Sequence, residues 1–178
     1  VFEKNPDVGG SWYENRYPGA RVDTPSRGYT HLFAYDYPFN WGYSPRDINM
    51  QYFRWIADNF KIRENIEFET EVLKMVWDDE AKVWTLGIQG PSGAGSETFN
   101  AVISCVGFLS RPQVPDIEGL ESFAGTACHS AAWPDGLDIT GKRVAIVGSG
   151  ASGYQTAPVI GSMAAETTLF QRQANWLY

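Results

Sequence analysis

The fold of this 178-residue chain is decided by the stretch Arg143-Val144-Ala145-Ile146-Val147-Gly148-Ser149-Gly150-Ala151-Ser152-Gly153. A short apolar run passes directly into three glycines with the spacing G-x-G-x-x-G. The apolar periodicity after the glycines predicts a helix of roughly 12 residues that continues through Ile160. Thr167–Phe170 is predicted to be the next strand. The order of strand, glycine turn, helix and strand is typical of a dinucleotide-binding unit.

Each glycine of the turn has a physical role in such a unit. Gly148 permits the tight turn, Gly150 lets a pyrophosphate approach the backbone, and Gly153 lets the helix pack closely against the strand. The first turn of the helix offers free N–H groups and a partial positive charge to phosphates. An ordinary glycine-rich turn is the alternative interpretation. The residues predicted to hold the dinucleotide here are Gly148, Ser149, Gly150, Ala151, Ser152 and Gly153.

The residue at the end of the second strand indicates which dinucleotide is bound. NAD sites usually have an acidic residue there, which accepts a hydrogen bond from the ribose 2′-hydroxyl. In this chain Arg172 stands 24 residues after Gly148. A guanidinium pairs with a 2′-phosphate through two hydrogen bonds, which favours NADP(H) over NAD(H). A solvent-exposed arginine at a strand end is the alternative.

The start of the chain indicates a second nucleotide site. Val1-Phe2-Glu3 has the pattern of the tail of a strand, and an acidic residue at such a position suits a free ribose hydroxyl. The glycine loop of that site would lie before residue 1, so the chain is expected to be a fragment, incomplete at both ends. The alternative is that Glu3 is simply a surface charge.

The middle of the chain predicts a helix followed by a β-meander. Ser44 is predicted to be the N-cap of the helix, with Asp47 at the capping-box position. Apolar residues then follow at helical spacing as far as Phe60. The meander, residues 66–106, is expected to end in a third strand that begins near Thr98 and runs into an apolar segment at 101–106, where it would enter the centre of a sheet.

Composition narrows the class of protein. The net charge of −7 excludes a generally basic nucleic-acid binder, and 43% apolar residues fit a soluble globular chain. The longest apolar stretch, Ala101–Leu109, is too short to span a bilayer. Cys105 and Cys128 lack metal-ligand spacing and are expected to be buried, reduced thiols of a cytoplasmic protein, with a disulfide as the alternative. No metal site, nucleic-acid partner or membrane partner is expected.

Two further motifs carry a family resemblance. The first is Gly9-Gly10-Ser11-Trp12-Tyr13-Glu14-Asn15-Arg16-Tyr17-Pro18-Gly19-Ala20-Arg21-Val22-Asp23, and the second is Phe123-x-Gly125-x-x-x-His129-x-x-x-Trp133-Pro134. With these motifs the chain resembles the flavin-dependent Baeyer–Villiger monooxygenases, most closely the hydroxyacetophenone (aryl-ketone) branch. Flavin enzymes that oxygenate nitrogen or sulfur are also similar, but their second motif usually ends in Tyr or Phe rather than Trp133-Pro134.

The resemblance implies an α/β fold with FAD- and NAD(P)-binding, three-layer Rossmann-like lobes and a small antiparallel meander. Residues 1–111 would form a partial FAD-binding lobe that lacks its first βα unit. Residues 112–142 would be an interlobe linker that carries the fingerprint residues Phe123, Gly125, His129, Trp133 and Pro134. Residues 143–178 would begin the NADP-binding lobe.

The resemblance also implies a role for individual residues. Glu3 would bind the ribose of FAD, and Val72 would lie beside its adenine. Asp23 and Tyr29 would lie near the flavin. The residues implied along the FAD are Gly10, Ser11, Trp12 and Tyr13. Those implied at the nicotinamide end are Arg21, Val22 and Asp23. Those implied to hold NADP beside the glycine turn are Gln155, Arg172 and Gln173.

The implied reaction is hydride transfer from NADPH to FAD, addition of O2 to give a flavin peroxide, and attack on a ketone, which yields an ester or lactone. Arg21 would supply positive charge near the oxyanion and Asp23 would orient nearby cations. The family's principal catalytic arginine would lie beyond Tyr178, so the isolated chain is expected to be inactive. His129 is expected to be structural rather than an acid–base group. The alternatives are an N- or S-oxygenating flavin enzyme and a non-catalytic nucleotide-binding module.

Overall fold

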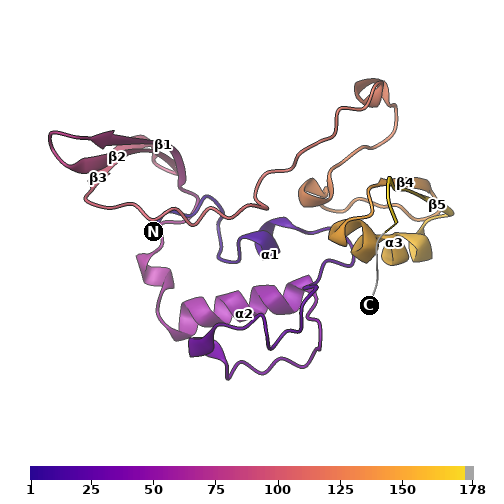
Figure 1. The fold of residues 1–178 in the computed structure, drawn as a ribbon, viewed down its shortest axis with the longest axis horizontal. Coiled ribbons are helices and arrows are strands. Elements are labelled where there is room, and N and C mark those ends of the chain that lie inside the picture. Colours follow the sequence, from indigo (N-terminus) through magenta and orange to yellow (C-terminus); the bar gives the residue numbers. More distant parts are fainter. Residues whose placement is uncertain (175–178) are drawn as a thin grey trace. The chain divides into compact units, whose positions relative to one another are not determined.

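The computed structural model describes residues 1–174 and has a mixed α/β fold (Figure 1). Contacts within the chain divide it into two units that are each discontinuous in sequence. The first unit contains Val1–Tyr13 and Met50–Phe108, and the second contains Glu14–Asn49 and the chain from Leu109 onward. The predicted boundaries at residues 111 and 142 separate lobes by the cofactor that each would bind, and this division stays a prediction.

The C-terminal part of the second unit has the predicted strand–turn–helix–strand order. Strand β4 (Arg143–Val147) is followed by helix α3 (Ala151–Met163) and strand β5 (Glu166–Phe170). The two strands pair in parallel, an arrangement that needs a crossover connection such as helix α3. Ile139, Ile146 and Ile160 form the buried cluster between these elements, so the βαβ unit has an apolar core of its own.

The first unit contains an antiparallel sheet in the order β1-β2-β3. The strands are β1 (Glu71–Asp78), β2 (Val83–Gly90) and β3 (Gly93–Phe99). The meander has a third strand, as predicted, but the prediction that this strand continues through residues 101–106 is wrong, because β3 ends at Phe99. This segment follows β3, pairs with no strand among residues 1–174, and leaves the Ile103 side chain 87% exposed. A strand must hydrogen-bond to a neighbouring strand, and an apolar pattern alone does not provide one.

Helix α2 (Arg46–Asn59) buries Met50, Ile56 and Ala57 on one face, which confirms the predicted amphipathic helix. The prediction of its cap is wrong. The Ser44 hydroxyl lies 2.6 Å from the hydroxyl of Ser26, and the Ser44 N–H donates to that same Ser26 oxygen at 2.9 Å. A serine 18 residues away in sequence therefore binds the groups that a capping box would use, and the helix begins at Arg46.

Short helices connect these elements. They are α1 (Ser11–Glu14), η1 (Leu32–Ala34), η2 (Arg63–Asn65), η3 (Leu120–Ser122) and η4 (Ser130–Ala132). None of the helices in the described part of the chain has the length and apolar character needed to cross a membrane.

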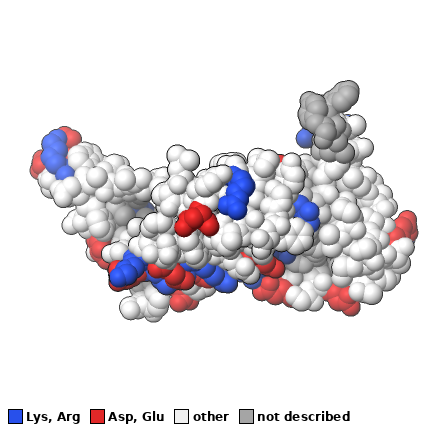
Figure 2. Space-filling model, turned by 90° about the horizontal axis from the view of Figure 1, so that it is seen from below, with Lys and Arg blue, Asp and Glu red and all other residues white. Residues whose placement is uncertain are grey.

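Both cysteines are free, as predicted, but the expectation that they are buried is wrong. Cys105 is exposed because it lies in the unpaired segment 101–106, and Cys128 is exposed in the long loop before η4. Residues 1–174 contain no group of three His, Cys, Asp or Glu side chains that could hold a metal ion. On the face shown in Figure 2, Lys and Arg side chains are interspersed with Asp and Glu.

Candidate cofactor-binding site

The glycine turn between β4 and α3 has the geometry of a phosphate-binding turn. Gly148 has a φ of +107°, a value that L side chains rarely adopt, and its N–H donates to the carbonyl of Phe170 at 2.9 Å. A Cβ added at Gly150 would meet no other part of residues 1–174 within 4 Å, whereas a Cβ at Gly153 would overlap the Gly148 carbonyl. The turn is thus open at Gly150, where a pyrophosphate would approach, and tightly packed at Gly153.

The end of β5 lies beside this turn. The hydroxyl of Ser149 donates to the carbonyl of Gln173 at 3.4 Å, which links the two segments. The carboxyl ends of parallel strands meet at the same edge of a sheet, so Arg172 and Gln173 lie at the edge where α3 begins. The Arg172 side chain is exposed and makes no hydrogen bond or ion pair within residues 1–174. A cationic group at this edge is therefore accessible to a ligand.

The segment that carries Arg21 forms a strand-like bridge in the second unit. The N–H of Val22 donates to the carbonyl of Ser44 at 3.0 Å, and the N–H of Arg46 donates to the carbonyl of Ala20 at 2.8 Å. The Ala20 and Val22 side chains are buried. Because alternate backbone groups of an extended segment point to opposite sides, the N–H and carbonyl of Arg21 face away from this bridge.

The side chain of Gln155, on the first turns of α3, occupies that opposite side. Its Oε1 accepts from the Arg21 N–H at 3.2 Å, and its Nε2 donates to the Arg21 carbonyl at 3.0 Å. The same Oε1 accepts from the Tyr17 hydroxyl at 2.9 Å. Gly19, with a φ of +83°, lies so close to the Gln155 carbonyl that a Cβ there would overlap it. The Arg21 segment is thus attached to the helix of the dinucleotide unit.

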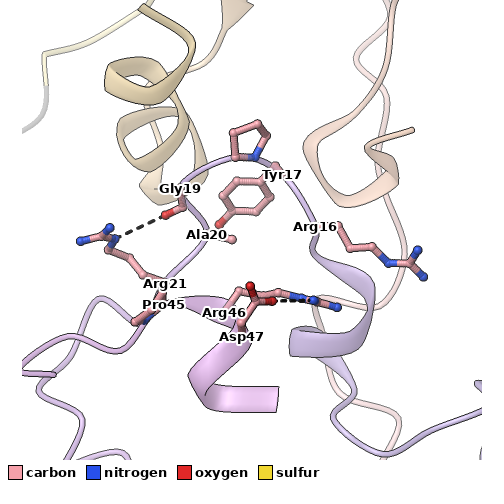
Figure 3. A pocket seen from close by; sticks show the side chains of 9 residues that line it. Arg16, Tyr17, Gly19, Ala20, Arg21, Pro45, Arg46 and Asp47 are labelled. Atoms are coloured by element: carbon pink, nitrogen blue, oxygen red, sulfur yellow. Dashed lines mark hydrogen bonds and ion pairs between the residues drawn. The ribbon is translucent and has the colours of Figure 1, made fainter. Parts of the chain in front are cut away.

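A pocket of about 300 Å³ lies beside this segment, and Figure 3 shows its lining side chains. In it the Nε of Arg21 donates to the Gly19 carbonyl at 3.4 Å, and Arg46 pairs with Asp47 at 2.8 Å. The Arg21 side chain is exposed. The nearby Asp23 carboxylate is also exposed and has no hydrogen-bond partner in the described part of the chain. These two charged groups are therefore available to a cofactor or substrate.

The fingerprint segment is held by packing and by one ion pair. The Trp133 side chain packs against the cluster formed by Ile139, Ile146 and Ile160. Asp135, directly after Pro134, accepts two hydrogen bonds from Arg16 at 2.9 and 3.1 Å. This arrangement connects the second motif with the first.

The other three fingerprint residues, Phe123, Gly125 and His129, make local contacts. His129 Nδ1 accepts from the N–H of Ala131 at 3.1 Å, so the histidine caps helix η4. A Cβ at Gly125 would meet the ring of Phe123 at 2.6 Å, so the ring lies over the glycine. The geometry around His129 favours a structural role, because its Nδ1 lone pair is already bound to the backbone.

The remaining candidate residues lie mainly in the first unit. The N–H of Glu3 donates to the Glu67 carbonyl at 3.0 Å, and its side-chain Oε1 accepts from the N–H of Asn5 at 2.8 Å. Gly10 has a φ of +50° and precedes α1, which contains Ser11, Trp12 and Tyr13. Val72 is half-buried in β1 opposite Ile88. Tyr29 belongs to the second unit and is 40% exposed.

The complete chain, residues 1–178, matches the model of the flavin-binding monooxygenase-like family. The chain belongs to this family. A Baeyer–Villiger monooxygenase of Streptomyces coelicolor is 38% identical over 177 residues, which are 99% of this chain and 33% of that protein. Acetone monooxygenase (methyl acetate-forming) of Gordonia sp. strain TY-5 is 36% identical over 179 residues, covering 97% of this chain and 33% of that protein.

Solved structures agree with this assignment of the flavin-binding monooxygenase-like chain. The crystal structure of OTEMO in complex with FAD and NADP superposes with a TM-score of 0.89 at 34% identity, covering 98% of this chain and 34% of that one. The chain therefore spans about a third of the length of the relatives that it matches.

Sequence reasoning missed several residues that organise this flavin-binding monooxygenase-like site. Tyr17 and Gly19 hold the Arg21 segment against α3, and Asp135 holds the first motif through Arg16. The pair Pro18-Gly19 does indicate a turn. Its partner, Gln155, is 134 residues beyond Arg21, so no local signal could have identified the contact.

Proposed function

We propose that the protein containing this chain is an FAD- and NADPH-dependent monooxygenase, which inserts one oxygen atom of O2 into a ketone to give an ester or lactone. The observation that carries the proposal is the glycine turn of β4 and α3, open at Gly150 and with Arg172 at its edge, in a chain of the flavin-binding monooxygenase-like family. The names of the relatives, including acetone monooxygenase, support a small ketone as substrate.

The residues of the turn fit NADP(H). The space at Gly150 and the free N–H groups at the start of α3 suit a pyrophosphate, and the exposed Arg172 guanidinium suits a 2′-phosphate. Ser149 and Gln173 link the turn to the end of β5, which keeps Arg172 beside the turn. The proposed NADP(H) site therefore consists of the turn residues 148–153 together with Arg172 and Gln173.

The residues of the first unit are compatible with the adenosine end of FAD. One oxygen of the Glu3 carboxylate is bound to the Asn5 N–H, and the second oxygen would accept from a ribose hydroxyl. A Cβ added at Gly10 would meet nothing within 4 Å in the described part of the chain, so a ligand could approach its backbone. The half-buried aromatic side chains of Trp12 and Tyr13 would exclude water from the cofactor. We propose that Val72 contacts the adenine.

Arg21 and Asp23 are the proposed charged groups near the reacting atoms. FAD, once reduced by NADPH, supplies the activation of O2. The exposed Arg21 guanidinium would stabilise negative charge that develops on oxygen, because a positive group placed close to an oxyanion lowers its energy. Asp23 would orient neighbouring cations, and Val22, buried between them, would fix their spacing. Tyr29 would lie at the edge of the flavin.

The experiment that tests the NADP(H) site compares NADP⁺ and NAD⁺ binding to the wild-type chain and to Arg172→Ala. We expect Arg172→Ala to weaken NADP⁺ binding by about 10- to 100-fold, because a charge-assisted phosphate contact is lost, and to leave NAD⁺ binding unchanged. Arg143→Ala, at the opposite end of the same sheet, is the matched control and should have no effect. Equal weakening of NADP⁺ and NAD⁺, or none, would contradict the assignment.

The reaction itself is tested with the flavin-loaded protein that contains this chain. NADPH, O2 and acetone should yield methyl acetate, and ¹⁸O from ¹⁸O2 should appear in the ester. Product analysis with a thioether in parallel separates the proposal from an S-oxygenating flavin enzyme. Sulfoxide without any ester would reject the ketone oxygenation proposed here.

A further inference from the structure

We propose that Gln155 is a positioning residue that connects the dinucleotide-binding helix α3 to the Arg21–Asp23 segment. The inference rests on the proposed function, because it assigns to Gln155 a role in the same site. Gln155 was expected to hold NADP directly. In the structure, however, its side-chain amide is bound to the backbone of Arg21 and to the hydroxyl of Tyr17.

The amide of Gln155 acts on Arg21 as a neighbouring strand would. A β-strand neighbour offers one acceptor and one donor to the N–H and carbonyl of the same residue. Gln155 does this with Oε1 at 3.2 Å from the Arg21 nitrogen and with Nε2 at 3.0 Å from the Arg21 carbonyl oxygen. The other edge of this short segment pairs with Ser44 and Arg46. The backbone at Arg21 is thereby held from both sides, although its guanidinium stays exposed.

Packing around Gln155 leaves little freedom for the segment to move away. Gly19 contacts the Gln155 backbone carbonyl, and a Cβ at Gly19 would also meet Val159 Cγ2 at 3.0 Å. The Tyr17 side chain is only 9% exposed while its hydroxyl binds Gln155. All these groups belong to the second unit. Gln155 lies two residues after Gly153, so the same turn of helix would contact the NADP pyrophosphate and the Arg21 segment.

The consequence is a thermodynamic link between the two positions. Binding of NADP⁺ at the glycine turn would order the start of α3, and Gln155 would transmit that order to residues 20–23. By thermodynamic linkage, a ligand that rigidifies one partner of a hydrogen bond also slows amide hydrogen exchange at the other partner. The Arg21 N–H reports on this directly, because its hydrogen-bond acceptor is the Gln155 side chain itself.

The test is amide hydrogen exchange of the protein that contains this chain, with and without NADP⁺, in wild type, Gln155→Leu and Gln155→Glu. Without ligand, Gln155→Leu should accelerate exchange at Arg21 by about tenfold, because the acceptor is lost. Gln155→Glu keeps an acceptor for the Arg21 N–H but cannot donate to the carbonyl, so it should give a smaller acceleration. NADP⁺ should slow exchange at residues 20–23 in wild type and not in Gln155→Leu.

Controls separate positioning from loss of fold and from loss of ligand binding. Exchange of the paired amides of β4 and β5 should be equal in all variants, and Gln51→Leu, at an exposed position of α2, should behave as wild type. Unchanged exchange at Arg21 in Gln155→Leu would overturn the proposal. So would a large loss of NADP⁺ affinity without a change at Arg21, which would make Gln155 a direct ligand. If wild type fails to bind NADP⁺, the proposed function fails, and the ligand-free comparison still decides whether Gln155 holds Arg21.

Discussion

Gly153 lies against the carbonyl of Gly148, at a distance that no Cβ could occupy. This contact brings the first turn of α3 directly onto the end of β4, so the N–H groups of that turn, which have no partner within the helix, lie at the glycine turn. The role predicted for the third glycine, close packing of helix on strand, is therefore present in the structure. Disrupting this packing at Gly153 should lower the free energy of unfolding.

Gly153→Ala is predicted to destabilise the second unit by about 1–3 kcal/mol, because the added methyl group forces the turn apart. Urea denaturation followed by circular dichroism measures the change. The matched control is Gly161→Ala in the same helix, where an added Cβ would meet none of the other described segments within 4 Å. That control should be neutral or more stable by up to about 1 kcal/mol, since alanine is the better helix former. Equal effects at both positions would contradict the packing explanation.

Gly19→Ala is predicted to lower the free energy of unfolding by about 2 kcal/mol or more. An alanine at positive φ is strained, and its Cβ would overlap the Gln155 carbonyl. Gly42→Ala is the control, since its Cβ would meet nothing within 4 Å among residues 1–174. Thermal unfolding of both variants gives the comparison. If Gly19→Ala had the same melting temperature as the wild type, the close approach of this segment to α3 would be wrong.

Asp7 is predicted to stabilise the first unit in a pH-dependent way. Burial alone would raise its pKa, but hydrogen bonds from Arg54, Arg63 and the Val8 N–H outweigh burial and lower the pKa below 3.8. Because the folded pKa is depressed, the stabilisation is complete above the unfolded value and is lost as the pH falls through the folded value. Asp7→Asn should therefore lower the free energy of unfolding by about 1–3 kcal/mol at pH 7.

Urea titrations between pH 7 and pH 2.5 check this prediction. The difference in the free energy of unfolding between wild type and Asp7→Asn should narrow below pH 3.8. Asp47→Asn should lower the free energy of unfolding by less than about 1 kcal/mol at any pH, because the Asp47 side chain is 79% exposed and is paired with the adjacent Arg46. A difference for Asp7→Asn that stays constant with pH would refute the role of its charge.

His129→Leu is predicted to lower stability by about 1 kcal/mol, because the cap on the Ala131 N–H is lost. His129→Asn keeps a side-chain acceptor at the cap position and should recover most of that loss. Turnover of the flavin-loaded protein should survive His129→Asn with an unchanged pH profile. A pH–rate profile that loses one limb in His129→Asn would instead identify His129 as an acid–base group.

The chain also shows which features sequence patterns can predict. The β4–turn–α3–β5 order was predictable because apolar runs, glycine spacing and helical periodicity are local properties of neighbouring residues. The helix at α2 was predictable for the same reason. Its cap was not, because Ser26 reaches the Ser44 hydroxyl from 18 residues away. The apolar pattern of residues 101–106 indicated a strand, but strand pairing depends on a neighbour that the pattern does not specify.

The candidate site likewise contains features that local sequence predicts and contacts that it does not. The amino-acid sequence alone determined the glycine turn, the arginine after the second strand and the family to which both belong, because each depends on residues close together in the chain. Only the tertiary structure decided that Gln155 holds the backbone of Arg21, that Arg16 pairs with Asp135, and that Cys105 is exposed. These contacts, or their absence, depend on which distant segments fold against one another. That arrangement is decided by how the apolar surface of the whole chain is removed from water, which no short stretch of sequence specifies.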